Sequence, residues 1–149
     1  MGVMTANSDE YAPSPTGWVR DQVEKVTAAG TTSVVDIKGM RVVLLTMRGA
    51  KSGKIRKVPL MRVEHNGVYA AVASLGGAPK NPVWYYNLKA DPKLTVQDGE
   101  TTKEYVAREI EGDEYAEWWP RAVEAYPPYA EYQTKTTRKI PLFVLDPVD

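Results

Sequence analysis

Five basic side chains gather in the segment RGAKSGKIRKVP, which runs from Arg48 to Pro59. They are Arg48, Lys51, Lys54, Arg56 and Lys57, in a chain whose 19 Lys and Arg are balanced by 19 Asp and Glu. A turn at Lys51-Ser52-Gly53 can add backbone N–H groups and a hydroxyl to this local positive charge. The combination predicts a binding site for a small ligand with several negative charges. The alternative is a basic turn exposed to solvent.

The same segment comes close to a nucleotide-binding phosphate loop but does not satisfy its pattern. Only three residues separate Gly49 from Gly53, where the phosphate loop has four. Ile55 stands where that loop carries a magnesium-binding hydroxyl, and Val58-Pro59 favours a strand over a helix. We therefore exclude a phosphate loop and expect a strand-turn-strand.

Three tyrosines near the end of the chain form a second group that could do chemistry: Tyr126, Tyr129 and Tyr132. The chain holds nine Tyr and four Trp but a single Phe, so most of its aromatic rings carry a hydrogen-bonding group. A helical turn that begins at Pro127-Pro128 would place Tyr129 and Tyr132 on one face. The pattern favours a pocket for a flat polar ring, and the alternative is an aromatic patch packed on a barrel end.

Composition excludes several classes of protein. Without cysteine the chain has no disulfide, thiolate nucleophile or Cys-based zinc site, and with one histidine, His65, we expect no metal site. The balanced charge argues against a nucleic-acid binder. The N-terminus does not resemble a signal peptide, and the apolar runs are too short to span a membrane. These features predict a cytoplasmic protein.

Helical patterns occur in three segments. The first begins after Ser14-Pro15 or Thr16 and ends at Gly30. The second lies in NPVWYYNLKADPK, where we expect Asn81 to be the N-cap and Asp91-Pro92 to end the helix. The third covers residues 113–136 and is interrupted by prolines.

Strand patterns cover residues 41–47, 57–65, 67–74, 94–110 and 139–147. Asn66-Gly67 and Asp98-Gly99 predict two hairpin turns. Local hairpins and the lack of strand-helix alternation predict a mainly antiparallel α+β fold, a barrel of six or so strands with flanking helices. Residues 1–13 are expected to form a flexible tail and residues 14–149 a single domain.

Four segments, taken in this order, resemble the deazaflavin-dependent nitroreductases of actinobacteria, which are F420-dependent oxidoreductases of the split β-barrel superfamily. They are VVLLTMRGAKSGKIRKVPL, YAAVASLGGAPKNPVWYYNLKADPKLTVQ, YAEWWP and AYPPYAEYQTKTTRKIPLFVL. The resemblance covers residues 39–147, and the ordered set is more specific than any one motif. It implies a split β-barrel and coenzyme F420, an 8-hydroxy-5-deazaflavin with a phospholactyl group and a polyglutamate tail.

The resemblance also implies which residues contact the cofactor. One group holds the phosphate, the tail and the ring edge: Ala50, Lys51, Ser52, Arg56, Lys57, Val58 and Pro59. A second group lies on the strand beneath the ring: Val72, Ala73, Ser74 and Leu75. A third group belongs to the helix that closes over the cofactor: Val83, Trp84, Tyr85, Tyr86 and Asn87. Tyr129 makes a further contact.

By the same resemblance, the substrate pocket contains Met61, Tyr126, Tyr129 and Tyr132, and the catalytic residues are Ser74, Tyr126 and Tyr132. Their hydroxyls are expected to hydrogen-bond the acceptor and to supply a proton. Met61 and Leu75 replace more polar residues of the best-known member, which makes the expected site less polar.

The resemblance implies hydride transfer from reduced F420 to a small-molecule acceptor. The acceptor would be an activated C=C bond (an enone or a coumarin- or furanocoumarin-type lactone), a quinone or a nitro-aromatic. Two alternatives stay open: a deazaflavin carrier without turnover, and an FMN-binding split-barrel oxidoreductase. The chain is expected to be a monomer or a homodimer. Its charged N-terminal helix does not indicate membrane association, although a peripheral position on the inner membrane face stays open.

Overall fold

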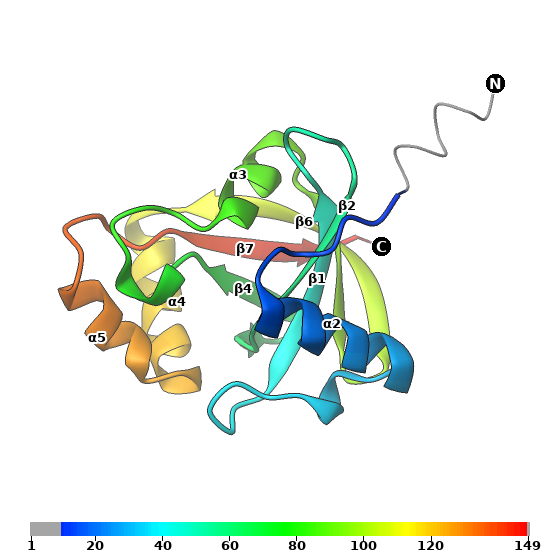
Figure 1. Ribbon diagram of the computed structural model, residues 1–149. Helices are drawn as coiled ribbons and strands as arrows, with labels where there is room; N and C mark the ends of the chain where they lie inside the picture. Colours follow the sequence, from blue (N-terminus) through cyan, green and yellow to red (C-terminus); the bar gives the residue numbers. More distant parts are fainter. Residues whose placement is uncertain (1–9, 149) are drawn as a thin grey trace.

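A computed structural model describes residues 10–148 as one curled antiparallel sheet with helices around it (Figure 1). The strands are β1 (Val42–Arg48), β2 (Ile55–Met61), β3 (Glu64–His65), β4 (Val68–Val72), β5 (Lys93–Asp98), β6 (Thr101–Ile110) and β7 (Leu142–Pro147). Their order is β2-β1-β5-β6-β7-β4-β3, and every neighbouring pair is antiparallel. The curl brings β2 beside β4 without a hydrogen-bonded ladder between them in residues 10–148. The predicted α+β split barrel is confirmed, with seven strands and one open side.

Within residues 10–148, four helices and two short 3₁₀ turns surround this half-barrel. They are α2 (Gly17–Ala29), η1 (Thr32–Val34), η2 (Leu75–Gly77), α3 (Val83–Ala90), α4 (Gly112–Ala125) and α5 (Pro128–Thr134). In Figure 1, α4 and α5 lie together at one end of the sheet, while α2 lies near the other end. The helices cover parts of the outer surface, and Trp84 and Leu88 of α3 also reach into the apolar cluster inside the barrel.

The strands build the core by strict alternation of their side chains. Val43 and Leu45 of β1 point into the barrel, where they share one apolar cluster with Phe143 of β7. Val42 and Leu44 point outwards, the first into the cluster under α4 and α5 and the second against α2. Both faces of β1 are thus covered, and this explains its unbroken apolar sequence. Each such buried side chain contributes about 1.5–3 kcal/mol relative to an exposed one.

Several predicted boundaries are confirmed, and one cap is wrong. The helix α2 ends at Gly30, whose φ of 76° is the left-handed conformation that glycine adopts readily. The helix α3 ends at Asp91, as predicted, but its N-cap is Pro82 and not Asn81. The Oδ1 atom of Asn81 instead accepts a hydrogen bond from Nη1 of Arg138 at 2.9 Å. The side chain that we expected to cap the helix therefore bonds to a residue far away in the sequence.

The single strand that we predicted over residues 57–65 is in fact two strands. The N–H of Arg62 still donates to the carbonyl of Arg41, on the β1 side. The carbonyl of the next residue, Val63, accepts from Ala70 of β4. The chain changes partner between these two residues, so β2 ends at Met61 and β3 begins at Glu64.

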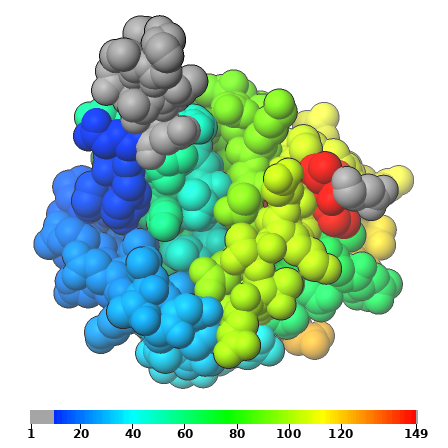
Figure 2. Space-filling model, turned by 90° about the vertical axis from the view of Figure 1, so that its right-hand side faces the viewer, coloured from blue at the N-terminus to red at the C-terminus, as the bar shows by residue number. Residues whose placement is uncertain are grey.

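Residues 1–9, most of the expected tail, lie outside the described residues. Residues 10–12, which we also placed in that tail, are hydrogen-bonded to the start of β2. In Figure 2 this dark blue segment lies directly against the teal surface of the β2 region. It leads into α2 across the open side of the barrel.

Candidate active site

A cavity of about 510 Å³ lies at the open side of the barrel, where β2, the end of β4, α3 and α5 come together. Fourteen of the residues that the resemblance singles out line it: Arg56, Lys57, Val58, Pro59, Met61, Val72, Ser74, Leu75, Val83, Trp84, Asn87, Tyr126, Tyr129 and Tyr132. They come from segments far apart in the sequence. The fold thus collects in one place part of the basic stretch and all three of the clustered tyrosines.

Six residues with an expected cofactor role are not part of this lining: Ala50, Lys51, Ser52, Ala73, Tyr85 and Tyr86. Ala73 is fully buried in the barrel interior. The hydroxyl of Tyr85 donates to Oε1 of Glu109 at 3.0 Å, and its ring packs on Phe143. Tyr86 is exposed on the same helix. The first three residues belong to the turn between β1 and β2.

The strand β2 contributes a free edge to the cavity. The N–H of Ile55 donates to the carbonyl of Glu10, and the carbonyl of Ile55 accepts from Ala12, so both groups point away from β1. Backbone groups of alternate residues point the same way, which directs those of Lys57 and Pro59 to the open side. A proline is tolerated there because no strand within residues 10–148 pairs with this edge at Pro59 and needs its missing N–H.

The turn between β1 and β2 is attached to the helix α3. The N–H of Ala50 donates to Oδ1 of Asn87 at 2.9 Å, and Asn87 is buried. Within the turn, Oγ of Ser52 accepts from the N–H of Lys54 at 3.1 Å. The hydroxyl that we expected to face an anion therefore also shapes the turn, and its hydrogen remains available as a donor. In Figure 1 this turn and α3 lie side by side.

Within residues 10–148, two of the five cations have partners in the segment before α2. The Nζ atom of Lys57 lies 5.3 Å from the ring centroid of Tyr11, and Nζ of Lys54 pairs with Oε2 of Glu10 at 3.3 Å. Arg56 lines the cavity next to them. One end of the cavity is therefore strongly basic, and the N-terminal segment forms part of this end.

The opposite end is built from the hydroxyls and rings of three tyrosines. The Tyr126 and Tyr132 hydroxyls are 3.2 Å apart, and the ring centroids of Tyr126 and Tyr129 are 5.0 Å apart. Burial, with added repulsion from Tyr126 and Tyr132, raises the pKa of Tyr129. The hydrogen bond with Tyr126, together with burial, raises the pKa of Tyr132. Such groups act as hydrogen-bond donors.

Ser74 follows the end of β4 and lies at this end of the cavity. It is buried, it lines the cavity, and the next residue, Leu75, has a φ of 44°. The carbonyl of Ser74 accepts from the N–H of Gly77 and from Nη2 of Arg138. The turn that carries the serine is therefore held by long-range contacts.

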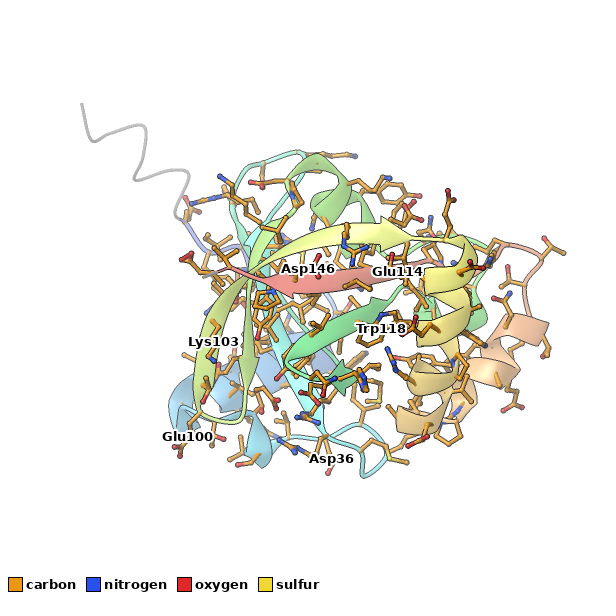
Figure 3. The ribbon with its side chains drawn as sticks, turned by 180° about the vertical axis from the view of Figure 1, so that it is seen from behind. Asp36, Glu100, Lys103, Glu114, Trp118 and Asp146 are labelled. Atoms are coloured by element: carbon orange, nitrogen blue, oxygen red, sulfur yellow. The ribbon has the colours of Figure 1, made fainter. Side chains whose placement is uncertain are left out.

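Sequence reasoning missed two parts of the site. The first is the segment from Ser14 to Val19, which lines the cavity and includes the half-exposed Trp18. The second is Arg138, which is one cation of a basic run and carries no local signal of its role. Trp118, labelled in Figure 3, packs in the cluster beneath α4 and does not line the cavity.

Neither a metal site nor a membrane span is apparent in the part of the chain that the structure describes. Over residues 10–148, no three His, Asp or Glu side chains gather where they could hold a metal ion. None of the helices in this range is long and apolar enough to cross a membrane.

The half-open antiparallel barrel with a cavity at its open side places the protein in the split-barrel class. The family model described as F420H(2)-dependent quinone reductase matches residues 18–147, and the chain belongs to that family. Family membership makes it an enzyme whose cofactor is coenzyme F420.

Individual relatives agree with this assignment. The F420H(2)-dependent quinone reductase of Mycobacterium tuberculosis strain H37Rv is 35% identical over 105 residues, which is 68% of this chain and 70% of the relative. A second protein of that strain, named after the same activity, is 36% identical over 110 residues, covering 74% of this chain and 92% of its own.

Solved structures show the same relation. One described as an F420-H2 dependent reductase is 62% identical, with a TM-score of 0.68, over 70% of this chain and 93% of that chain. Another, described as a domain-swapped dimer, is 58% identical, with a TM-score of 0.71, over 89% of this chain and all of that chain. A heme storage protein of Vibrio cholerae, 14% identical over 75% of this chain and 84% of its own with a TM-score of 0.56, shares the fold alone.

The residues present fit coenzyme F420. An anionic tail requires cations, and Arg56 and Lys57 line one end of the cavity beside the basic turn. A flat ring requires apolar walls, which Val58, Pro59 and Val72 provide. The free backbone edge of β2 can add hydrogen bonds to the ring edge.

Proposed function

We propose that this chain transfers a hydride from reduced coenzyme F420 to a quinone, with enones, coumarin-type lactones and nitro-aromatics as further acceptors in vitro. One observation carries the proposal: a single cavity has cations at one end and tyrosine hydroxyls with Ser74 at the other. The family to which the chain belongs supports the quinone as the first acceptor to test.

In this proposal Arg56, Lys57 and the basic turn hold the cofactor's phosphate and glutamate tail. Charge-assisted hydrogen bonds to such oxygens are about twice as strong as neutral ones. Asn87 fixes the turn by accepting from Ala50, which keeps the cations next to the cavity. When bound in its reduced form, the deazaflavin supplies the hydride.

The chain's own contribution at the other end is to orient and polarise the acceptor. Ser74 and one hydroxyl of the Tyr126–Tyr132 pair would donate hydrogen bonds to the acceptor oxygen, on which negative charge develops. One of the tyrosines would deliver the proton that completes the reduction. Met61 and Leu75 also line the cavity and reduce its polarity, which strengthens those hydrogen bonds.

We further propose that the chain forms a homodimer, because the 58% identical solved structure is described as a domain-swapped dimer. Light scattering on the purified protein tests this point, and a mass of one chain at all concentrations would refute it.

The activity is tested by following the absorbance of reduced F420 with one acceptor of each class. We expect oxidation with the quinone and slower oxidation with the other acceptors. Tight F420 binding without oxidation by any acceptor would indicate a carrier and would overturn the proposal.

A further inference from the structure

The turn that carries Ser74 has a backbone that short-range interactions do not favour. Three consecutive residues adopt left-handed conformations: Leu75 with a φ of 44°, Gly76 with 64° and Gly77 with 85°. The two glycines tolerate this, but a leucine in that region is strained. Such a conformation persists only where the surrounding structure holds it. Some other part of the protein must therefore hold this turn.

Arg138 hydrogen-bonds to both sides of the strained turn. Its Nη1 donates to the carbonyl of Ala73 at 3.1 Å and its Nη2 donates to that of Ser74 at 2.8 Å. Its Nε donates to the carbonyl of Ala78 at 2.9 Å, and Nη1 also reaches Oδ1 of Asn81. One planar guanidinium thus joins the residues before the turn to those after it.

Arg138 is in turn attached to the helix that carries the tyrosines. Gln133 of α5 donates from Nε2 to the carbonyl of Arg138 at 2.8 Å, and its Oε1 accepts from the N–H of Ile140 at 2.9 Å. The same helix touches the turn directly, because a Cβ atom on Gly77 would lie 2.8 Å from the carbonyl oxygen of Tyr132. The arginine therefore links the serine to the tyrosines.

The partners of Arg138 indicate a geometric role and not charge pairing. Within residues 10–148 its guanidinium forms no ion pair with a carboxylate, and the four hydrogen bonds given above all go to neutral oxygens. Removal from water lowers the pKa of Arg138. A lysine could not replace this fork, because its single ammonium cannot reach acceptors on both sides of the turn.

We propose that Arg138 is a positioning residue of the reductase, which sets Ser74 against Tyr126 and Tyr132 so that all three can contact the acceptor. Arg138 does not line the cavity, so it acts through the turn and not on the acceptor. The inference rests on the proposed function for its effect on turnover, but not for its effect on the turn.

The first test compares Arg138→Gln and Arg138→Lys with the matched control Arg121→Gln. Arg121 lies on α4, where it pairs with Glu117 and stacks on Trp118 away from the cavity. We expect both Arg138 variants to lower kcat about 10- to 100-fold, because small displacements at a reacting centre have effects of this size. The KM for reduced F420 should change far less than kcat, because the cations proposed to hold the cofactor's tail lie at the other end of the cavity, and the control should keep its kcat. Unchanged kcat in the Arg138 variants, or a rise in the KM for reduced F420 as large as the fall in kcat, would overturn the proposal.

The second test needs no activity and uses hydrogen exchange on the protein without cofactor. The amides of Gly77 and Ala78 donate within the turn, to the carbonyls of Ser74 and Leu75. In both Arg138 variants we expect faster exchange over residues 74–81 and unchanged exchange in β5 and β6. Unchanged exchange in the turn, or faster exchange over the whole barrel, would contradict the positioning role. If the wild-type protein reduces no acceptor while the turn still loosens, the proposed function fails and the link between Arg138 and the turn stands.

Discussion

The hydroxyls of Tyr126 and Tyr132 lie 3.2 Å apart at one end of the cavity. Either can donate to the other, so only one hydrogen of the pair is free for a ligand at a time. An acceptor oxygen placed beside them would receive that hydrogen, and the partner hydroxyl would support the donor. The two residues should therefore act as a unit.

Replacing these hydroxyls should affect turnover more than cofactor binding. We expect Tyr126→Phe and Tyr132→Phe each to lower kcat about 100-fold, the size seen for loss of one donor to a developing oxyanion. The double variant should lose less than the sum of the two effects, since the residues are coupled. Steady-state kinetics with a quinone measures all three variants.

The control for this experiment is Tyr115→Phe. The Tyr115 hydroxyl donates to the carbonyl of Ile140 at 2.6 Å, outside the cavity lining. This variant should lose about 1 kcal/mol of stability and keep its kcat. Unchanged turnover in the Tyr126 and Tyr132 double variant would refute a catalytic role for the pair.

Replacing the cations at the other end of the cavity should weaken cofactor binding without a direct effect on the acceptor. We expect Arg56→Ala, which removes a cavity-lining charge, to raise the Kd for F420 about five- to tenfold at low salt, and Lys51→Ala to raise it less. Both effects should shrink at high salt, because ions screen exposed charge pairs. Fluorescence quenching of F420 measures the Kd.

Lys103→Ala is the matched control, since Lys103 is an exposed cation on the β5–β6 hairpin (Figure 3). The Kd of this variant for F420 should equal that of the wild-type protein. A Kd that is unchanged in both Arg56→Ala and Lys51→Ala would show that the basic stretch is only a charged turn.

At the scale of residues, the local sequence predicted where charged side chains gather, but not which distant residues a side chain contacts. The basic cluster could be recognised because its five members lie within ten positions. Asn87 and Arg138 could not, because their partners, Ala50 and the Ser74 turn, are far away in the sequence and only the fold brings them together.

Among the elements, the contact between η2 and α5 determines how the serine meets the tyrosines. The helix lies so close to the turn that only a residue without a side chain fits at Gly77. The neighbouring Gly76 has a similar backbone conformation, but a Cβ atom added there would meet no atom within 4 Å. The two glycines thus differ in how closely other atoms approach them, and not in backbone conformation.

This difference gives a paired experiment. We expect Gly77→Ala to cost about 1–3 kcal/mol of stability and to lower kcat, because the added carbon forces α5 away from the turn. Gly76→Ala should cost about 1 kcal/mol through its backbone alone and should keep most of the activity. Thermal unfolding measures the stability of both variants, and steady-state kinetics measures their kcat. Equal kcat values in the two variants would show that the close approach of α5 to Gly77 does not position the site.

The elements themselves were predictable where local chemistry determines them. The Asn66-Gly67 and Asp98-Gly99 hairpins are present, with β3–β4 and β5–β6 on either side. The break between β2 and β3 was not predictable, because the apolar pattern continues through it and only the change of partner at Arg62 and Val63 ends the strand.

For the molecule as a whole, a charge cluster ties the end of β5 to β4 and to the segment between β2 and β3. Oδ2 of Asp98, at the end of β5, accepts from Nε of Arg62 at 2.8 Å and from the hydroxyl of Tyr69 on β4 at 2.5 Å. Arg41 adds a further bond to Oδ1. Burial alone would raise the pKa of Asp98, but these hydrogen bonds and the two arginine charges outweigh it, so the pKa lies below its usual value.

A carboxylate with a lowered pKa stabilises the folded state above its unfolded pKa, and this stabilisation is lost as the pH falls through its folded pKa. We therefore expect Asp98→Asn to be less stable than the wild-type protein by about 1–3 kcal/mol at neutral pH. The difference should shrink once the pH falls below about 4, the usual range of an aspartate. Urea unfolding followed by tryptophan fluorescence measures it.

Asp146→Asn serves as the control, because Asp146 pairs with Arg108 at an exposed site on β7 (Figure 3). Its loss should cost less than about 1 kcal/mol at neutral pH. If the two variants were equally stable at neutral pH, the cluster around Asp98 would have no special part in holding the barrel.

The barrel class followed from the hairpins and strand patterns, but its open side and the cavity did not. Both arise from the curl of the sheet, which sets β2 beside β4, and sequence patterns do not encode this proximity. The position of the N-terminal segment along the edge of β2 is likewise a consequence of the whole fold.

The initial rate of reduced F420 oxidation, measured while F420 and quinone concentrations are both varied, tests the central claim most directly. The chain has no cysteine, so its own side chains cannot store the two electrons between two separate half-reactions. The account has both molecules bound together in the cavity, so we predict saturation in both, with intersecting lines in double-reciprocal plots. Parallel lines, or binding of reduced F420 without quinone-dependent oxidation, would contradict the account.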